Sequence, residues 1–520
     1  MSERVRKSIN NMTFGIIEQV VTILLTFITR TIFIRILDAS LLGVNGLFSN
    51  ILSILSIAEL GFGTAIVYGM YKPIAEKDTK KIAALMTYYK KVYNILAIVV
   101  LIVGIAIIPF LKYLINVENQ IDHLVLYYII FLSDSVCSYL LANKVAIIQA
   151  NQNFYIIKRY STCFVILKNI LQILALVIFK NFILYLLIQV GITFLTNLYG
   201  AILAKKMYPY AFEKTELEKE EKNKLIENVK SMAIYRLGGA VMNHTDNILI
   251  SVLTGTIKVG LYSNYNMIIS SINRFINIIY TSITASVGDL NASKENEKKL
   301  DVFNNIDFFT NWLYGFCSVA LFILLNNFIS IWIGEKYMFD LLTVFAIVLN
   351  FYILGILNPI LTYRDTTGLF KQTKYIFLIT AVINLILSII LGKIWGIFGI
   401  LIASAIARIL TNFWYEPYIL FKNYFKMSSK KYFYNRFVNI NLVVLNCFIM
   451  LLIFKILDTF NINNIILFVI KVLITGIIPN IVFLLFYNRK KEFKYFKEMI
   501  FNILKGGKKN GKRNCNIQNI

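Results

Sequence analysis

Polar residues recur along one face of each of the first two long apolar segments, within residues 13–71. The first segment carries a deep charge at Arg30 and the second carries one at Glu59. At about 100° per residue, the polar positions of each segment fall on a single helical face. A helix that faces lipid is apolar all round, so such a face must line a protein interior or a water-filled space. The two stripes consist of Glu18, Thr22, Thr26, Thr29 and Arg30, and of Asn45, Ser49, Ser53, Ser56, Glu59 and Gly63. We therefore expect two consecutive membrane helices that face a lumen.

Apolar segments of about 20 residues, the length that spans a bilayer, recur along the whole chain. They predict an all-α polytopic membrane protein with fourteen transmembrane helices. We expect these near 13–36, 42–70, 92–115, 122–149, 156–179, 182–206, 231–253, 260–287, 304–327, 340–363, 374–391, 396–421, 437–456 and 463–487. The expected domains are an N-terminal six-helix lobe at 1–206, a cytoplasmic linker at 207–230, a C-terminal six-helix lobe at 231–425, an extra helix pair at 426–487 and a basic cytoplasmic tail at 488–520.

The two six-helix segments resemble each other at an offset of 217 residues. This offset places Gly43 on Gly260 and brings the polar stripes of the two segments into register. Thr26, Thr29 and Arg30 then match Asn243, Asp246 and Asn247, while Ser49, Ser53 and Ser56 match Asn266, Ser270 and Asn273. An even number of helices per segment gives a parallel repeat about an axis along the membrane normal. The pattern predicts two pseudo-symmetric lobes.

The composition agrees with a membrane protein, since 58% of the residues are hydrophobic, 16% are charged and the mean hydropathy is +0.67. A soluble chain would carry about a quarter charged residues. The net charge of +25 reflects the orientation of the chain in the membrane, because lysines and arginines gather in every second connection between the predicted helices. Each of the other connections holds a single basic residue: Arg35, Lys112, Lys180, Lys258, Lys336, Lys393 and Lys455. Cytoplasmic loops retain basic residues, so both termini are expected in the cytoplasm and nucleic acid is not expected as a partner. The five cysteines and two histidines show no spacing of a disulfide or metal site.

Basic residues predominate among the charges inside the predicted helices. A central Arg or Lys costs about 2.5–3.5 kcal/mol, so these residues call for a function. Because arginine grips phosphate oxygens in pairs, the excess suggests an anionic, phosphate-bearing substrate. The candidate substrate-binding residues are Arg30, Lys168, Arg236, Arg274 and Arg408, and the candidate ion-coupling residues are Glu59, Asp134 and Asp246. Structural roles stay open as alternatives: snorkelling for Lys144 and Arg236, an ion pair for Glu18 or Asp134, and a lipid or helix contact for Lys471.

Four segments carry a resemblance to a known family: Arg30–Leu37 (RTIFIRIL), Leu42–Phe48 (LGVNGLF), Glu59–Ala65 (ELGFGTA) and Tyr71–Pro73 (YKP). They resemble the opening of bacterial capsular and O-antigen repeat-unit flippases, of the multidrug/oligosaccharidyl-lipid/polysaccharide exporter superfamily. Asp38-Ala39 departs from the pattern, in which a glycine follows Leu37. The resemblance implies fourteen helices, with two six-helix lobes and an extra pair. It also implies transport of undecaprenyl-pyrophosphate-linked oligosaccharides from the cytoplasmic to the outer leaflet.

We therefore expect a lipid-linked oligosaccharide flippase of the bacterial cytoplasmic membrane, working by alternating access. Its expected partners are polyprenyl-pyrophosphate-linked oligosaccharide, membrane lipids, and the polymerase and glycosyltransferases of the same pathway. No cofactor is expected beyond H+ or Na+ as a coupling ion. The alternative is a multidrug or organic-cation antiporter of the same fold, which the excess of basic residues disfavours. An enzyme is not expected, because no outer connection exceeds about a dozen residues and no phosphate-binding loop is present.

Overall fold

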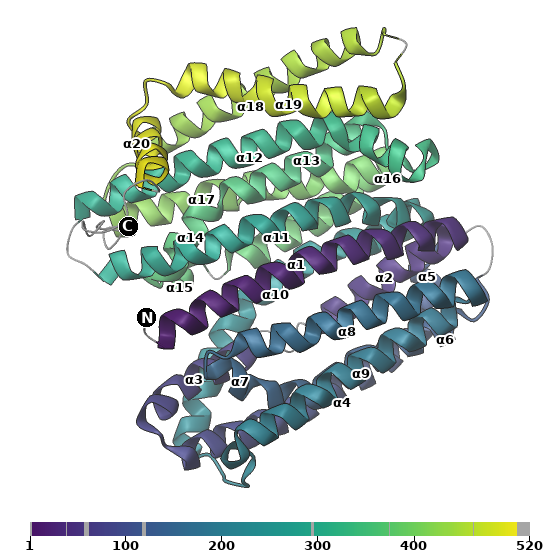
Figure 1. Ribbon diagram of the computed structural model, residues 1–520, viewed down its shortest axis with the longest axis vertical. Coiled ribbons are helices and arrows are strands. Elements are labelled where there is room, and N and C mark those ends of the chain that lie inside the picture. Colours follow the sequence, from purple (N-terminus) through teal and green to yellow (C-terminus); the bar gives the residue numbers. More distant parts are fainter. Residues whose placement is uncertain are drawn as a thin grey trace. The chain divides into compact units, whose positions relative to one another are not determined.

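The computed structural model describes residues 3–37, 39–56, 62–116, 121–292, 296–373, 375–460 and 462–506. Within these ranges the chain forms helices joined by short connections, and no residue lies in a β-strand (Figure 1). The predicted all-helical architecture is confirmed. Glu59, expected to couple transport to an ion, lies outside the described residues.

The chain packs as two compact units. The first comprises Met1–Met267 and Ile389–Ile397, and the second comprises Ile268–Ser388 and Phe398–Ile520. Two long helices contribute to both units, because α11 (Thr256–Ala292) and α16 (Ile376–Leu410) each contain a boundary. The lobes at 1–206 and 231–425 describe sequence repeats and remain a prediction.

In the first unit, α1 packs along α8, α6 packs against α4 and α9, and α2 packs against α10 (Figure 1). Local hydrogen bonds fix some of the helix starts. Asp78 accepts a hydrogen bond from the backbone N–H of Lys81 (2.9 Å), and Asn181 accepts one from that of Leu184 (3.1 Å). The helices of this unit besides α11 and part of α16 are α1 Glu3–Ile36, α2 Ala39–Leu55, α3 Phe62–Glu76, α4 Thr79–Ile107, α5 Leu111–Leu114, α6 Leu124–Ala142, α7 Ala146–Ala150, α8 Phe154–Leu174, α9 Phe182–Met207 and α10 Lys219–Thr254. Shorter helical turns cover Ile108–Phe110, Asn143–Val145, Ala175–Phe179 and Pro209–Phe212.

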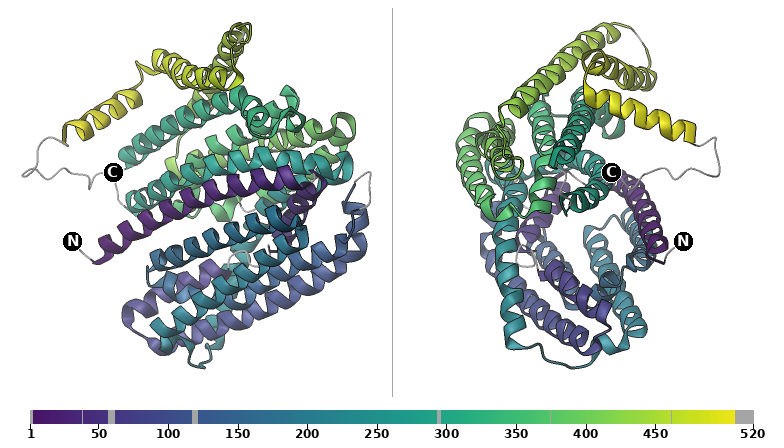
Figure 2. Two further views of the ribbon diagram at one scale, coloured as in Figure 1. Left: turned by 45° about the vertical axis from the view of Figure 1, so that its right-hand side comes forward. Right: turned by 90° about the vertical axis from the view of Figure 1, so that its left-hand side faces the viewer.

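In the second unit, α12 is the central helix, with α13 on one side and the yellow-green pair α18 and α19 beside it (Figures 1 and 2). The short C-terminal helix α20 also contacts α12, where Phe496 stacks on Phe308 and Phe309 with ring centroids 6.0 and 5.9 Å apart. The helices of this unit besides α11 and α16 are α12 Asn296–Ile333, α13 Leu341–Ile356, α14 Asn358–Thr367, α15 Phe370–Thr373, α17 Asn412–Leu420, α18 Lys430–Leu457, α19 Asn464–Tyr487 and α20 Lys491–Gly506. Shorter turns cover Glu335–Tyr337 and Phe421–Phe425.

Ten helical runs among the described residues are long and apolar enough to cross a membrane. The count of fourteen therefore remains a prediction. The predicted helix at 42–70 corresponds to two helices, because α2 ends at Leu55 and α3 begins at Phe62. Near the end of α2, Ser49, Ser53 and Ser56 each donate a hydrogen bond to the carbonyl four residues earlier, at 2.7, 2.7 and 2.9 Å. Such bonds compete with the helical ladder and bend helices, which the apolar pattern alone does not show.

Two other predicted helices are interrupted. The helix predicted at 340–363 divides between α13 and α14, with Pro359 in the first turn of α14, where the missing N–H is tolerated. In α16 the backbone leaves helical geometry at Gly396, with φ 61° and ψ −136°, a conformation open to glycine. The break expected between residues 391 and 396 is thus present at Gly396. A second break at Thr411 separates α16 from α17.

Within the first unit, α2 crosses the beginning of α11 at two glycines. A Cβ atom on Gly43 would lie 2.1 Å from the carbonyl oxygen of Thr256, and one on Gly260 would lie 2.9 Å from that of Ala39. The Gly260 Cβ would also lie 2.9 Å from the backbone nitrogen of Gly43, so the two backbones are in direct contact. These are the glycines that the 217-residue offset pairs. Residues equivalent in the predicted repeat therefore lie against each other.

Candidate functional site

A buried hydrogen bond holds α1 against α8 in the first unit. Thr29 donates to the side-chain oxygen of Asn169 over 2.7 Å, and both residues are buried. Asn169 in turn donates to the carbonyl of Val165 on its own helix (2.8 Å). Because a buried polar side chain is costly without a partner, this pairing fixes the register of the two helices. It places two predicted substrate-binding residues, Arg30 and Lys168, directly beside the bond.

Arg30 is half-buried and is oriented by neutral groups. Its Nε atom donates to the side-chain oxygen of Asn264 over 2.9 Å, and its Nη2 atom contacts the hydroxyl of Ser263. Tyr185 of α9 lies close enough to interact with it electrostatically. No carboxylate of the described residues forms an ion pair with Arg30. The guanidinium is therefore held in place, while no carboxylate among the described residues offsets its positive charge.

Asp134 of α6 and Lys168 of α8 form a second polar group in the same unit. One carboxylate oxygen of Asp134 accepts a hydrogen bond from Gln189 of α9 (2.8 Å), while the other is buried and has no hydrogen-bond partner within the described structure. Lys168 interacts with Asp134 electrostatically, without a direct ion pair. We call the set Thr29, Arg30, Asp134, Lys168, Asn169, Gln189 and Asn264 the N-terminal polar cluster. With two cations and one carboxylate, this cluster favours an anion.

The remaining predicted residues have different surroundings. In the second unit, Arg408 is only 5% exposed, and its Nη1 atom contacts the side-chain oxygen of Asn350. Asn350 also donates to the carbonyl of Leu401 (2.7 Å), so a ligand would reach Arg408 only if α13 and α16 moved apart. Arg274 is exposed and makes no ion pair with a described residue. Asp246 is buried in the first unit. The side chain of Arg236 is outside the described part of the chain.

Two arginines that the sequence pattern assigns to cytoplasmic connections are instead buried in ion pairs. Arg364 bonds Glu416 at 2.8 Å, with side chains 3% and 0% exposed. Arg436, 1% exposed, bonds Asp307 at 2.7 Å. The alternation of basic residues does not reveal these partners. The sequence feature that could have predicted these ion pairs is the acidic partner. Glu416 and Asp307 lie in apolar segments, and a buried carboxylate requires a partner.

Arg436 has further hydrogen-bond partners besides Asp307. Its guanidinium donates to Asn311 over 2.6 Å and to the carbonyl of Ile356 over 3.0 Å. It thereby links α18 to α12 and α13. Lys471 of α19, for which a lipid or helix contact was open, pairs with Asp458 at 2.6 Å and is 4% exposed. Both interactions fasten the last helices to their neighbours. In the described part of the chain, no three His, Cys, Asp or Glu side chains gather closely enough to hold a metal ion.

Comparisons with known proteins identify a family from the sequence and a shared fold from solved structures. Residues 8–284, more than half of the chain, match the family described as polysaccharide biosynthesis protein. No curated protein matches the chain. A structure of the lipid II flippase MurJ in an inward closed conformation aligns with a TM-score of 0.62 and 18% identity, covering 91% of this chain and 98% of that one.

Other transporters share the fold at lower similarity. A mutant form of the Vibrio cholerae MATE transporter VcmN aligns with a TM-score of 0.55 and 12% identity, covering 78% of this chain and 93% of that one. A MOP superfamily transporter from Pyrococcus furiosus, described as having a binding pocket of reverse polarity, aligns with a TM-score of 0.52 and 12% identity, covering 78% and 92%. At these identities the matches show a shared fold.

Proposed function

Because the chain belongs to the polysaccharide biosynthesis protein family, we propose that it is a flippase for polyprenyl-pyrophosphate-linked oligosaccharide repeat units. It moves them from the cytoplasmic to the outer leaflet of the bacterial cytoplasmic membrane for capsule or O-antigen export. The observation that carries the proposal is the state of Arg30, a fixed guanidinium without a carboxylate partner among the described residues. Such a group offers planar, paired donors to the oxygens of a pyrophosphate.

The transport cycle proposed is alternating access about a cationic lumen. Arg30 and Lys168 bind the pyrophosphate first, since they adjoin in sequence the two residues of the Thr29–Asn169 hydrogen bond between α1 and α8. Arg236, Arg274 and Arg408 are further contacts during the cycle. The polymerase and glycosyltransferases of the same pathway supply the substrate and consume the product.

Coupling to an H+ or Na+ gradient belongs to the same proposal, with Glu59, Asp134 and Asp246 as the groups that bind the ion. Asp134 has the best support, because one of its carboxylate oxygens is buried and has no hydrogen-bond partner within the described structure. That oxygen can take up a proton or contact a cation. The electrostatic interaction of Asp134 with Lys168 links ion binding to substrate binding. When Asp134 is neutralised, Lys168 attracts an anionic substrate more strongly.

The alternative function, export of organic cations, is favoured by the fold shared with MATE transporters. Substitution of Arg30 separates the two. R30Q should abolish export of the lipid-linked glycan while leaving insertion intact, and R30K should restore it only in part, because an ammonium lacks the planar fork. The matched control is R35Q, which removes an exposed charge from the same helix. Mass spectrometry of accumulating lipid intermediates measures the effect.

A binding measurement with the purified protein tests whether the substrate is an anion or a cation. A polyprenyl pyrophosphate should raise the thermal unfolding midpoint, whereas the same lipid with a neutral head should raise it much less. A charge-assisted contact is worth about 1.5–3 kcal/mol, so the contrast is measurable. If ethidium stabilises the protein and the pyrophosphate lipid does not, the chain is a cation exporter. Full export by R30Q would remove the observation on which the flippase proposal rests.

A further inference from the structure

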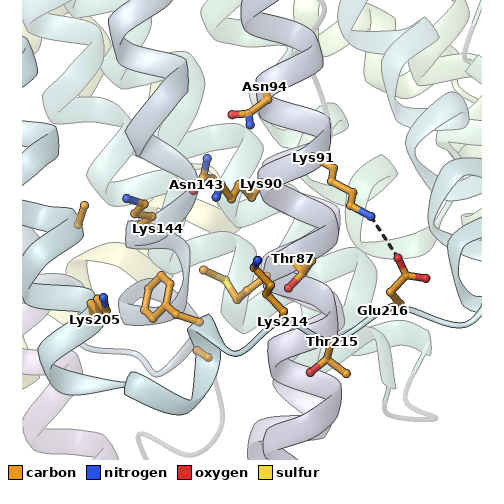
Figure 3. Close-up of a pocket in the computed structure, with 14 residues that line it drawn as sticks. Thr87, Lys90, Lys91, Asn94, Asn143, Lys144, Lys205, Lys214, Thr215 and Glu216 are labelled. Atoms are coloured by element: carbon orange, nitrogen blue, oxygen red, sulfur yellow. Dashed lines mark hydrogen bonds and ion pairs between the residues drawn. The ribbon is translucent and has the colours of Figure 1, made fainter.

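A lysine-lined cavity of about 600 Å³ lies in the first unit, and none of its lining residues belongs to the N-terminal polar cluster. Its wall is formed by α4, the turn after α6, the end of α9 and the segment that follows α9 (Figure 3). Five lysines and one carboxylate line it: Lys90, Lys91, Lys144, Lys205, Lys214 and Glu216. We call this space the lysine cavity. The sequence pattern explains these lysines as topology signals or as a snorkelling side chain. It does not explain why they surround one hollow.

Within the described part of the chain, few carboxylates offset the positive charge of the lysine cavity. Glu216 pairs with Lys91 over 3.4 Å, and both side chains are exposed, so the pair contributes little. No described carboxylate pairs with the four other lysines. Several ammonium groups around a shared space repel one another, and a bound anion offsets that repulsion.

Neutral groups in the wall make the lysine cavity a defined site. Asn143 and Ala211 are 2% and 0% exposed, so the wall is ordered by packing. Asn94 and Thr215 add side-chain donors beside the lysines. Phosphate oxygens accept hydrogen bonds from ammonium, hydroxyl and amide groups alike. The lining therefore matches a phosphate group.

The lysines stand where apolar helix segments end. Lys90 and Lys91 directly precede the apolar run of α4, and Lys205 follows that of α9. Along the same helices, Ile98 and Ile202 are 56% and 60% exposed, which suits contact with acyl chains. Lysines at the ends of membrane helices lie at the depth of lipid phosphates.

We propose that the lysine cavity binds a phosphate-bearing anion. The ligand is either the headgroup of an anionic phospholipid or a soluble phosphate compound, and both present the same oxygens. The proposal does not rest on the proposed function, since the residues and the probes differ. Its test uses the full-length protein in neutral detergent, with phosphatidylglycerol and sodium pyrophosphate as probes.

The key comparison is between two triple variants. K90Q/K144Q/K205Q removes charge from the lysine cavity, whereas K80Q/K206Q/K219Q removes the same charge from three exposed lysines outside it. Native mass spectrometry counts retained phosphatidylglycerol, and thermal unfolding measures affinity for both probes, with phosphatidylcholine and equal ionic strength of chloride as references. The cavity variant should bind about tenfold more weakly or worse, the loss expected from one charge-assisted contact. The control variant should bind like the wild type.

The outcomes show whether the lysine cavity binds a phosphate group and whether that group belongs to a lipid or to a soluble compound. Loss of phosphatidylglycerol binding alone assigns the site to a lipid headgroup, and loss of pyrophosphate binding alone assigns it to a soluble anion. R30Q should leave the effect of phosphatidylglycerol intact, which separates the lysine cavity from the substrate site. If the cavity triple does not fold, the single variants K90Q and K205Q replace it. Equal binding by cavity and control variants, or by both single variants and the wild type, would overturn the proposal.

Discussion

At the scale of single residues, the Arg436–Asp307 pair shows how a buried charge is stabilised in this chain. The two groups are 2.7 Å apart, with side chains 1% and 14% exposed. D307N would leave the guanidinium buried without a counter-charge. Breaking such a pair costs about 3–5 kcal/mol, so we expect a large fall in the free energy of unfolding, measured by thermal or denaturant unfolding in detergent.

An exposed ion pair whose carboxylate also lies on α12 provides the control. Lys491 contacts Asp301 at 3.3 Å, with side chains 83% and 58% exposed. D301N should cost at most about 1 kcal/mol, because water already solvates both charges. The double variant D307N/R436M should recover part of the loss, since it removes the unpaired charge. Equal destabilisation by D301N and D307N would contradict this account.

The sequence predicts the residues of the candidate site unevenly. Arg30 and Lys168 are foreseen from their depth, and the structure places them beside one hydrogen bond, Thr29 to Asn169. The partners Asn264 and Gln189 are not foreseen, because they lie on α11 and α9, far away in sequence. Hydrophobic periodicity identifies a polar face within one helix. It does not show how two helices cross, and contacts between helices depend on that crossing. For the same reason, Arg364 and Arg436 read as loop charges until Glu416 and Asp307 are placed against them.

At the scale of elements, the crossing of α2 and α11 depends on the absence of a side chain. G43A would place a methyl group 2.1 Å from a backbone oxygen, so the helices would have to separate. Overpacking of this kind costs about 1–3 kcal/mol. We expect a lower unfolding midpoint for G43A and reduced transport, measured with the same lipid-intermediate assay.

G46A is the matched control for that substitution, one turn further along α2. A Cβ atom on Gly46 would lie 3.4 Å from a methyl group of Val259, which is an ordinary contact. This variant should be close to the wild type. If G43A is as stable and as active as G46A, the crossing is looser than the structure indicates.

Helix existence is more predictable than helix continuity. The long apolar runs predict α8, α9, α18 and α19 close to their observed bounds, because burial and lipid contact both require apolar residues there. The helix expected near 92–115 is α4, which begins earlier, at Thr79, and ends earlier, at Ile107. Continuity fails where a single residue leaves helical geometry, as at Thr411 after α16. A hydropathy window averages over such positions. Gly396 is the exception, since glycine itself marks the break.

At the scale of the whole molecule, the alternation of basic residues predicts which connections face outward. Lys258, Lys336 and Lys219 are all exposed, so membrane sidedness alone should control their labelling. In a background without native cysteines, K258C and K336C should react with an impermeant thiol reagent added to intact cells. K219C should react only after permeabilisation, which shows that the cysteine itself is reactive. Labelling of K219C in intact cells would reverse the topology.

The contact between Gly43 and Gly260 also bears on the ancestry of the chain. If a half-length protein once assembled as a symmetric dimer, a two-fold axis along the membrane normal would bring one position against its own copy. A single mutation at that position would have added one side chain from each subunit at the axis, so the glycine could not easily be replaced. In the fused chain the two glycines are encoded separately, and either one can be replaced alone. Each retains a hydrogen atom as its side chain because the other backbone still occupies the space.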